Sequence, residues 1–340
     1  MTATLLAVGL ALCLAPILGH LMVQGGPVDR PRERGLHKAP TPTSGGLAVI
    51  AAIGCGLIAL GILDPGYSPD LKDTLPLLAF AALMGVNGAL DDLFDLPALP
   101  KLIVQMAAAL LLAGSGLRVE ALPLGFDTTL PVGPVLGTVF SALWILMVIN
   151  AVNFMDGSNG LALGVQGYAL VTLGVWLWPS APFFGGLLLI AGAANLGFLP
   201  LNLPLGRIFQ GDSGAFFSSA LIAGGVLFGA REAAFSPWFG GFLLLPLLVD
   251  VALTLVHRAR LRLPLMQAHR DHLYQVWLAR TGRPHADLAF RVWGLSLISL
   301  LIGTLAELQA KAWIAQIFGL SAFVLVIGWL IAYRRLSQNA

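Results

Sequence analysis

Long apolar stretches, each able to cross a lipid bilayer, recur along the whole chain. A hydrocarbon core of about 30 Å needs about 20 apolar residues in a helix, and we find about eleven such stretches. They cover approximately residues 2–23, 44–63, 75–90, 101–117, 135–152, 158–178, 183–199, 214–230, 236–256, 288–306 and 312–332. Charged residues make up only 11% of the 340 residues, against about 25% in a soluble domain. The sequence therefore predicts an all-α, polytopic integral membrane protein with a single domain over residues 1–340.

The distribution of basic residues predicts the orientation of these helices. Most of the 19 Lys and Arg residues fall in one set of alternate connections, whereas the other set holds only Lys72, Arg118, Arg231 and Lys311. Because cytoplasmic connections are enriched in Lys and Arg, we expect the N-terminus outside and the C-terminus in the cytoplasm. We expect the first stretch to be a retained helix, because no Lys or Arg precedes it as in a secretory signal.

Polar clusters occur only on the side predicted to be cytoplasmic. They lie at about residues 24–43, 87–101, 150–160, 200–214 and 257–287. A channel would continue its polar groups across the bilayer. The one-sided arrangement therefore favours an enzyme or a receptor for a cytoplasmic ligand.

Three carboxylates cluster in the segment NGALDDLFDLPALPK. Asp91, Asp92 and Asp95 fall within an arc of about 100° if the third helix continues through them, and the nearest cation along the chain is Lys101. Such a cluster calls for a cation, either Mg²⁺ or the basic groups of another loop. A solvated helix end is the alternative.

Two further segments place polar groups beside apolar helices. In INAVNFMDGSNGLA, the side chains of Asn150, Asn153 and Asp156 project within about 120° of one another, and a helix cap would explain only one of them. In IFQGDSGAFF, Asp212 lies between glycines at the start of an apolar helix. Asp212 could complement the helix dipole or approach a metal or ligand oxygen.

The segment QAHRDHLYQ combines two histidines with an arginine. His269 and His272 share one helical face and flank Arg270, in a loop rich in arginine. Anion binding suits this loop better than zinc binding, because a guanidinium binds phosphate through two parallel hydrogen bonds. A basic cytoplasmic loop without a ligand is the alternative. Asp250, inside the ninth stretch, is either a buried partner of a basic residue or part of the site.

Four motifs together resemble one known family. DDLFDLPALPKLIVQ, NAVNFMDGSNGLA, PLNLPLGRIFQGDSG and HRDHLYQ, in this order, resemble the polyprenyl-phosphate N-acetylhexosamine-1-phosphate transferases over residues 35–280. The resemblance implies a multi-pass enzyme of the bacterial inner membrane with a cytoplasmic site. It would transfer a sugar phosphate from a UDP-N-acetylhexosamine to undecaprenyl phosphate in the lipid bilayer and release UMP.

The resemblance also implies roles for individual residues. It assigns Asp91, Asp92, Asp156, His269 and His272 to catalysis, and Asn153 and Asp212 to Mg²⁺, with Mn²⁺ as an alternative metal. Lys38, Lys101, Asn150, Asn202 and Arg270 would bind substrate. No nucleic acid is expected as a partner, and a homodimer is one expected assembly.

The motifs resemble two branches of the family that use different sugars. DDLFDLP is similar to the branch that uses GlcNAc, whereas HRDHLYQ is similar to O-antigen initiating enzymes that use FucNAc or QuiNAc. A muramoyl-pentapeptide transferase is the nearest alternative, although the family's run of adjacent histidines is missing from this chain. A transporter of lipid-linked sugars is a more distant alternative, which would call for internal repeats.

Overall fold

The chain folds into a bundle of long helices whose bounds follow the apolar stretches. The computed structural model describes residues 1–24, 28–29, 40–66, 71–126, 128–267 and 269–338. Eleven helices coincide with the predicted stretches: α1 (Thr2–Met22), α2 (Gly45–Leu63), α3 (Leu71–Phe94), α4 (Ala98–Gly114), α5 (Gly133–Met155), α6 (Leu161–Leu177), α7 (Pro182–Asn202), α8 (Gly211–Arg231), α9 (Pro237–Arg260), α11 (His285–Gln309) and α12 (Ile314–Gln338).

Within the described ranges, nine helices are long and apolar enough to cross a membrane. The other two, α4 and α6, are apolar but have only 17 residues each. The polytopic helical membrane fold is therefore confirmed. The count of eleven crossings and the orientation of the termini stay predictions.

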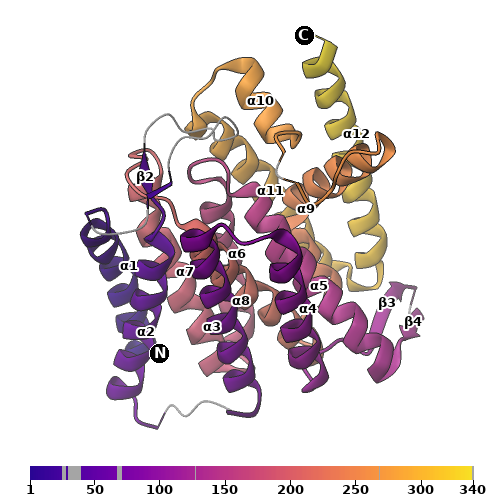
Figure 1. The fold of residues 1–340 in the computed structure, drawn as a ribbon. Coiled ribbons are helices and arrows are strands. Elements are labelled where there is room, and N and C mark those ends of the chain that lie inside the picture. The colour runs from indigo at the N-terminus through magenta and orange to yellow at the C-terminus, as the bar shows by residue number, and fades with distance from the viewer. Residues whose placement is uncertain (25–27, 30–39, 67–70, 127, 268, 339–340) are drawn as a thin grey trace.

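Short elements were missed by the sequence prediction of an all-α fold. Two antiparallel pairs of strands join β1 (Val28–Asp29) to β2 (Thr41–Pro42), and β3 (Ala121–Gly125) to β4 (Thr128–Pro131). A short amphipathic helix, α10 (Leu273–Thr281), lies in the loop after α9, and a single 3₁₀ turn, η1 (Lys311–Trp313), precedes α12. Figure 1 places β2, α10 and the C-terminus at one end of the bundle and the β3–β4 hairpin toward the other.

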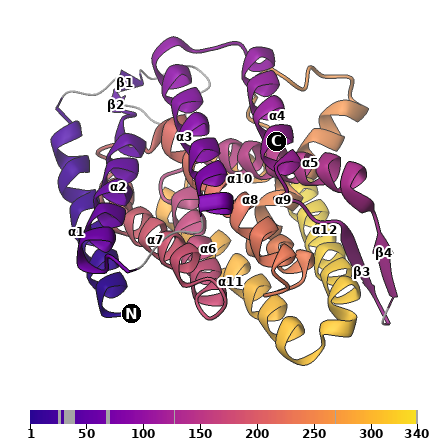
Figure 2. The ribbon, with the colours of Figure 1, turned by 90° about the horizontal axis from the view of Figure 1, so that it is seen from below.

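Helix α8 forms the centre of the bundle. It packs against α2, α3, α5, α6 and α9, and Figure 2 shows it surrounded by its neighbours. All its residues from Ser213 to Gly229 are buried. Because the helix is enclosed along its length, only its two ends can take part in surface chemistry.

Glycines bring α2 and α3 very close to this first turn. A Cβ atom on Gly46 of α2 would lie 2.1 Å from the backbone nitrogen of Gly214, and one on Gly88 of α3 would lie 2.3 Å from the carbonyl oxygen of Asp212. No side chain fits at these distances. The amides of Gly45 and Gly46 also donate hydrogen bonds to the carbonyls of Phe209 and Gln210. The start of α8 is thereby held between α2 and α3 by backbone contacts.

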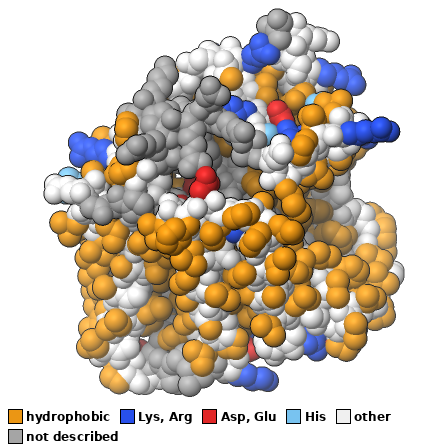
Figure 3. Space-filling view, viewed as in Figure 1, with side chains coloured by type: hydrophobic (Ala, Val, Ile, Leu, Met, Phe, Trp, Pro, Cys, Tyr) orange, Lys and Arg blue, Asp and Glu red, His pale blue; other side chains and the backbone are white. Residues whose placement is uncertain are grey.

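The surface of the bundle separates apolar from charged side chains. Figure 3 shows hydrophobic side chains over most of the visible lower face and charged side chains mainly above it. Many of the exposed side chains are large and apolar, among them Leu111, Val135 and Ile62. Exposure on this scale suits lipid contact and would be unusual in a soluble monomer.

Candidate active site

Asp92 binds the first turn of α8 from the last turn of α3. Its Oδ1 accepts a hydrogen bond from the backbone N–H of Asp212 at 2.9 Å, and its Oδ2 accepts one from the N–H of Ser213 at 3.1 Å. These amides have no partner within their own helix, and the N-terminal end of a helix dipole favours a negative charge. Gly211 makes room for the carboxylate, because a Cβ there would lie 2.6 Å from Asp92 Oδ2. Asp92 is therefore a structural link as well as a predicted catalytic residue.

Asp91 lies beside this link and contacts a cation. Its carboxylate pairs with the ammonium of Lys101 on α4 and accepts a hydrogen bond from the N–H of Leu96 at 2.8 Å. The side chains of Asp91 and Asp212 also lie within interaction distance of each other. Lys101 is therefore paired with one of two neighbouring carboxylates.

Asn153 and Asn150 contact different helices. The Asn153 amide donates a hydrogen bond to Asp212 Oδ1 at 2.7 Å. The Asn150 amide donates instead to Gln105 Oε1 on α4 and to the carbonyl of Leu146, both at 2.8 Å. The predicted metal ligands Asn153 and Asp212 are thus adjacent, whereas Asn150 joins α5 to α4.

The residues around Asp212 fit a magnesium ion. Among the described residues, no group of three or more His, Cys, Asp or Glu side chains is arranged to hold a metal. Mg²⁺ does not require such a group, since it commonly keeps several waters and binds one or two carboxylates together with substrate phosphates. Asp212 supplies a carboxylate, and rotation of the Asn153 amide would present its oxygen.

The turn between α5 and α6 contains Asp156 and is braced by Asn202. Burial raises the pKa of Asp156 to about 8. Asn202 is buried and uses both ends of its amide: it accepts from the N–H of Gly160 at 2.5 Å and donates to the carbonyl of Ile208 at 3.1 Å. The structure gives Asn202 a bracing contact, and its predicted contact with substrate stays a prediction.

The basic loop after α9 is folded on itself. Arg258 forms an ion pair with Asp271 and donates to the carbonyl of Pro264 at 2.6 Å. The rings of His269 and His272 stack with their centroids 5.0 Å apart. Burial lowers the pKa of both histidines, and that of His272 falls to about 3. His272 is therefore neutral at physiological pH, while Arg270 is exposed.

Helix α10 attaches this loop to the turn after α5. The hydroxyl of Tyr274 donates a hydrogen bond to the carbonyl of Phe154 at 2.9 Å, and the ring of His272 lies 5.8 Å from that of Phe154. Phe154 directly follows Asn153. The contact brings the predicted anion-binding loop next to the predicted metal ligands.

Some sequence predictions differ from the structure or fall outside it. Helix α3 ends at Phe94, so Asp95 does not continue the helical arc of Asp91 and Asp92; its φ is +52°. The physical reason lies in Leu96, which precedes Pro97 and is therefore driven away from helical geometry. Lys38 lies outside the described residues.

Two buried glutamines near the site were not predicted. Gln105 receives the Asn150 amide, and Gln210 lies beside Asp156. Among the described residues, neither polar atom of the Gln210 side chain has a hydrogen-bond partner. A single Gln in or beside an apolar stretch forms no sequence pattern that would predict a place in the site. Only the contacts in the structure show that Gln105 and Gln210 lie there.

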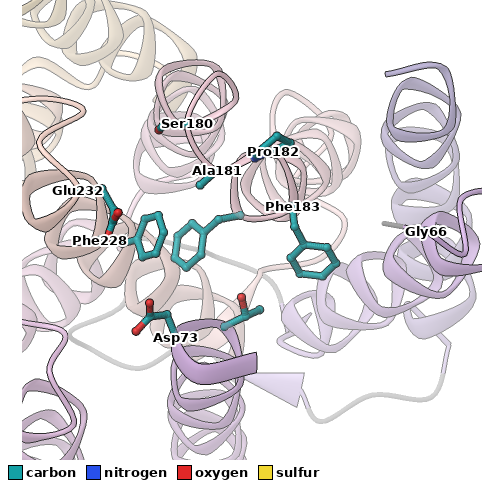
Figure 4. Close-up of a pocket in the computed structure, with 10 residues that line it drawn as sticks. Gly66, Asp73, Ser180, Ala181, Pro182, Phe183, Phe228 and Glu232 are labelled. Carbon is teal, nitrogen blue, oxygen red and sulfur yellow. The ribbon is translucent and has the colours of Figure 1, made fainter. Parts of the chain in front are cut away.

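A separate cavity of about 360 Å³ is not part of this site. Figure 4 shows its walls, which come from the start of α3, the turn before α7 and the end of α8. Its lining includes Asp73, Phe183, Phe228 and Glu232. These residues lie at the opposite ends of α3 and α8 from Asp92 and Asp212, so the cavity is a full helix length from the cluster of carboxylates.

Comparison with known proteins shows the family to which the chain belongs. Residues 74–230 match the family described as glycosyl transferase family 4. The chain is 28% identical over 324 residues to the Bacillus subtilis (strain 168) "Probable undecaprenyl-phosphate N-acetylglucosaminyl 1-phosphate transferase", covering 93% of this chain and 85% of that protein. It is 30% identical over 292 residues to the Mycobacterium tuberculosis (strain H37Rv) "Decaprenyl-phosphate N-acetylglucosaminephosphotransferase", covering 76% and 70%.

A third relative represents the alternative raised by the sequence. The "Phospho-N-acetylmuramoyl-pentapeptide-transferase" of Mycolicibacterium smegmatis is 29% identical over 279 residues, covering 66% of this chain and 76% of that protein. This match covers less of the chain than the two above. The chain belongs to the polyprenyl-phosphate hexosamine-1-phosphate transferases of glycosyl transferase family 4. The predicted family, the enzyme class of glycosyl-1-phosphate transferase and the multi-pass membrane fold are confirmed.

Proposed function

We propose that this protein transfers N-acetylhexosamine-1-phosphate from a UDP-sugar to undecaprenyl phosphate at the cytoplasmic face of the bacterial inner membrane. An oxygen of the lipid phosphate attacks the β-phosphorus of the UDP-sugar. The bond from that phosphorus to the bridging oxygen breaks, and UMP leaves with the electron pair. The products are UMP and a polyprenyl-diphospho-sugar that stays in the bilayer.

The observation that carries the proposal is the attachment of the basic loop, through Tyr274 and Phe154, to the end of α5 beside Asn153. Phosphoryl transfer depends mainly on positioning and on neutralising phosphate charge. Asp212 and Asn153 would hold Mg²⁺, which supplies charge neutralisation to the diphosphate. Arg270 would add a guanidinium on the loop side, and Lys101 an ammonium beside Asp91. The relatives' names support the lipid phosphate acceptor and the GlcNAc-type donor.

The test is a reaction with purified protein, Mg²⁺ and undecaprenyl phosphate in lipid nanodiscs. Separate samples receive UDP-GlcNAc, another UDP-N-acetylhexosamine, or UDP-N-acetylmuramoyl-pentapeptide, and UMP release is measured. We expect UMP release and a lipid-linked product with a UDP-N-acetylhexosamine. Product only with the muramoyl-pentapeptide donor would establish the alternative, and no UMP with any donor would refute the proposal.

A further inference from the structure

Asp250 is a buried carboxylate on α9 that receives four hydrogen bonds. Its Oδ1 accepts from the backbone N–H of Leu273 at 2.9 Å, and its Oδ2 from the N–H of Tyr274 at 3.3 Å. Trp329 Nε1 on α12 and Thr254 Oγ1 also donate to Oδ1, at 3.0 and 3.2 Å. A charge buried this deeply is costly unless it is hydrogen-bonded. Here the carboxylate connects the start of α10 to α9 and α12.

The structure adds a third interpretation of Asp250 to the two that the sequence offers. Among the described residues, Asp250 has no Lys or Arg partner, and the basic side chain beside it is His272, whose Nδ1 lies 3.9 Å from Asp250 Oδ1. Nor is Asp250 exposed toward a substrate, since it is only 5% exposed. It caps the N-terminus of α10 from another helix, which satisfies two amides that have no partner inside α10.

Helix α10 has a second attachment, to the turn that follows Asn153. Tyr274 is buried, and its hydroxyl donates to the carbonyl of Phe154. Gly157 makes space for this contact, because a Cβ there would lie 2.3 Å from the hydroxyl oxygen. The same first turn of α10 therefore contacts Asp250 and the turn that follows Asn153.

We propose that Asp250 is a positioning residue that holds His269 and Arg270 in place over the turn from Asn153 to Asp156, acting through α10. The inference rests on the proposed function, in which this loop binds the diphosphate of the sugar nucleotide. Asp250 does not touch substrate. Its loss should therefore weaken use of the UDP-sugar and leave use of the polyprenyl phosphate almost unchanged.

The first test combines Asp250→Asn with hydrogen exchange and kinetics on the full-length protein in nanodiscs. An amide offers one acceptor oxygen, so one of the two α10 amides loses its partner. We expect the peptide containing Leu273 and Tyr274 to exchange at least about tenfold faster. The KM for the UDP-sugar should rise about tenfold, with the KM for undecaprenyl phosphate within about twofold. Thr281→Ala, at the far end of α10, is the matched control and should change neither quantity.

A second variant removes the donor instead of the acceptor. Leu273→Pro deletes one amide at the first helical position, where proline is well tolerated, and His272 before it already has the extended ψ of 141° that a following proline requires. It should raise the UDP-sugar KM in the same direction. Unchanged UDP-sugar KM in both variants, or no faster exchange in Asp250→Asn, would overturn the inference. A wild-type protein that releases no UMP would instead refute the proposed function, while exchange would still report on Asp250.

Discussion

The Asn153 amide donates a hydrogen bond to Asp212 Oδ1 at 2.7 Å, and this contact joins the end of α5 to the first turn of α8. Asp92 reaches the same turn from α3. Three helices that are distant in sequence thus meet at Asp212. The first prediction concerns this carboxylate.

Asp212→Asn should abolish turnover and preserve the fold, because a neutral amide is a poorer ligand for a hard cation than a carboxylate. UMP release across a Mg²⁺ titration measures the first effect, and the melting temperature in detergent the second. Glu120→Gln, immediately before β3, is a control for removal of a carboxylate elsewhere and should retain activity. Normal turnover by well-folded Asp212→Asn would exclude the metal assignment.

Asp92→Asn should destabilise the protein and lower kcat. Asp92 accepts two backbone N–H groups with two carboxylate oxygens, and an amide can accept only one of them. A buried charge-assisted hydrogen bond contributes about 1.5–3 kcal/mol, so the melting temperature should fall measurably. Asp91→Asn should cost less stability, because the Asp91–Lys101 pair is partly exposed. Equal melting temperatures for Asp92→Asn and the wild type would contradict the capping role.

Arg270→Ala should lower kcat/KM for the UDP-sugar by about ten- to a hundredfold, which corresponds to loss of one charge-assisted contact. The lipid-phosphate KM should change much less. Arg270→Lys should restore part of the loss, because an ammonium cannot form the guanidinium's two parallel hydrogen bonds. An unchanged kcat/KM for the UDP-sugar in Arg270→Ala would contradict anion binding by this loop. It would favour the alternative of a basic cytoplasmic loop without a ligand.

Cysteine labelling should reveal the orientation predicted from the basic residues. In a background without Cys13 and Cys55, cysteines at Pro97 and Met266 should react with an impermeant thiol reagent only from the cytoplasmic face. One at Gly66 should react only from outside. All three positions are exposed. Labelling of Pro97 and Gly66 from the same side would contradict the predicted path of α3 across the membrane.

Stability should decrease as the pH falls below neutral, in part because of His272. Burial lowers its folded pKa to about 3, whereas the unfolded value is about 6.5. Between these values only the unfolded state binds the proton, so the free energy of unfolding falls as the pH falls from about 6.5 toward 3. Melting temperatures at pH 7.5, 6 and 4.5 would show this loss. His272→Asn, which also suits a helix cap, should have a smaller pH dependence.

Most long helices could be predicted because a helix that crosses the bilayer needs about 20 apolar residues. Such a stretch can be recognised in the sequence without knowledge of its neighbours. Helix α10 was missed because it has nine residues and partial burial on one side. Gly282, with φ +63° at its C-terminus, was the one local sign of where it ends. The β3–β4 hairpin contains Pro123 and Pro131, and this composition is atypical of strands.

The sequence motifs identified the candidate site residues, but they did not identify most of the residues that these side chains contact. The pairing of Asn153 with Asp212 could be expected from two motifs of similar chemistry. By contrast, Asn150 binds Gln105, and Asp250 binds amides of α10 and the indole of Trp329. Those partners are 23 to 79 residues away in the chain. Residue type and spacing within a single segment do not predict such long-range contacts.

The glycine contacts around α8 fix one part of this enzyme by backbone packing, whereas the connection between α9 and α10 is not fixed in this way. Direct backbone contact sets the distance of Gly46 and Gly88 from the first turn of α8, so this separation does not depend on any side-chain rotamer. The connection between α9 and α10, in contrast, exposes consecutive side chains from residues 261 to 267. Side chains at residues 261–267 can therefore be substituted without disturbing the backbone contacts that hold the first turn of α8.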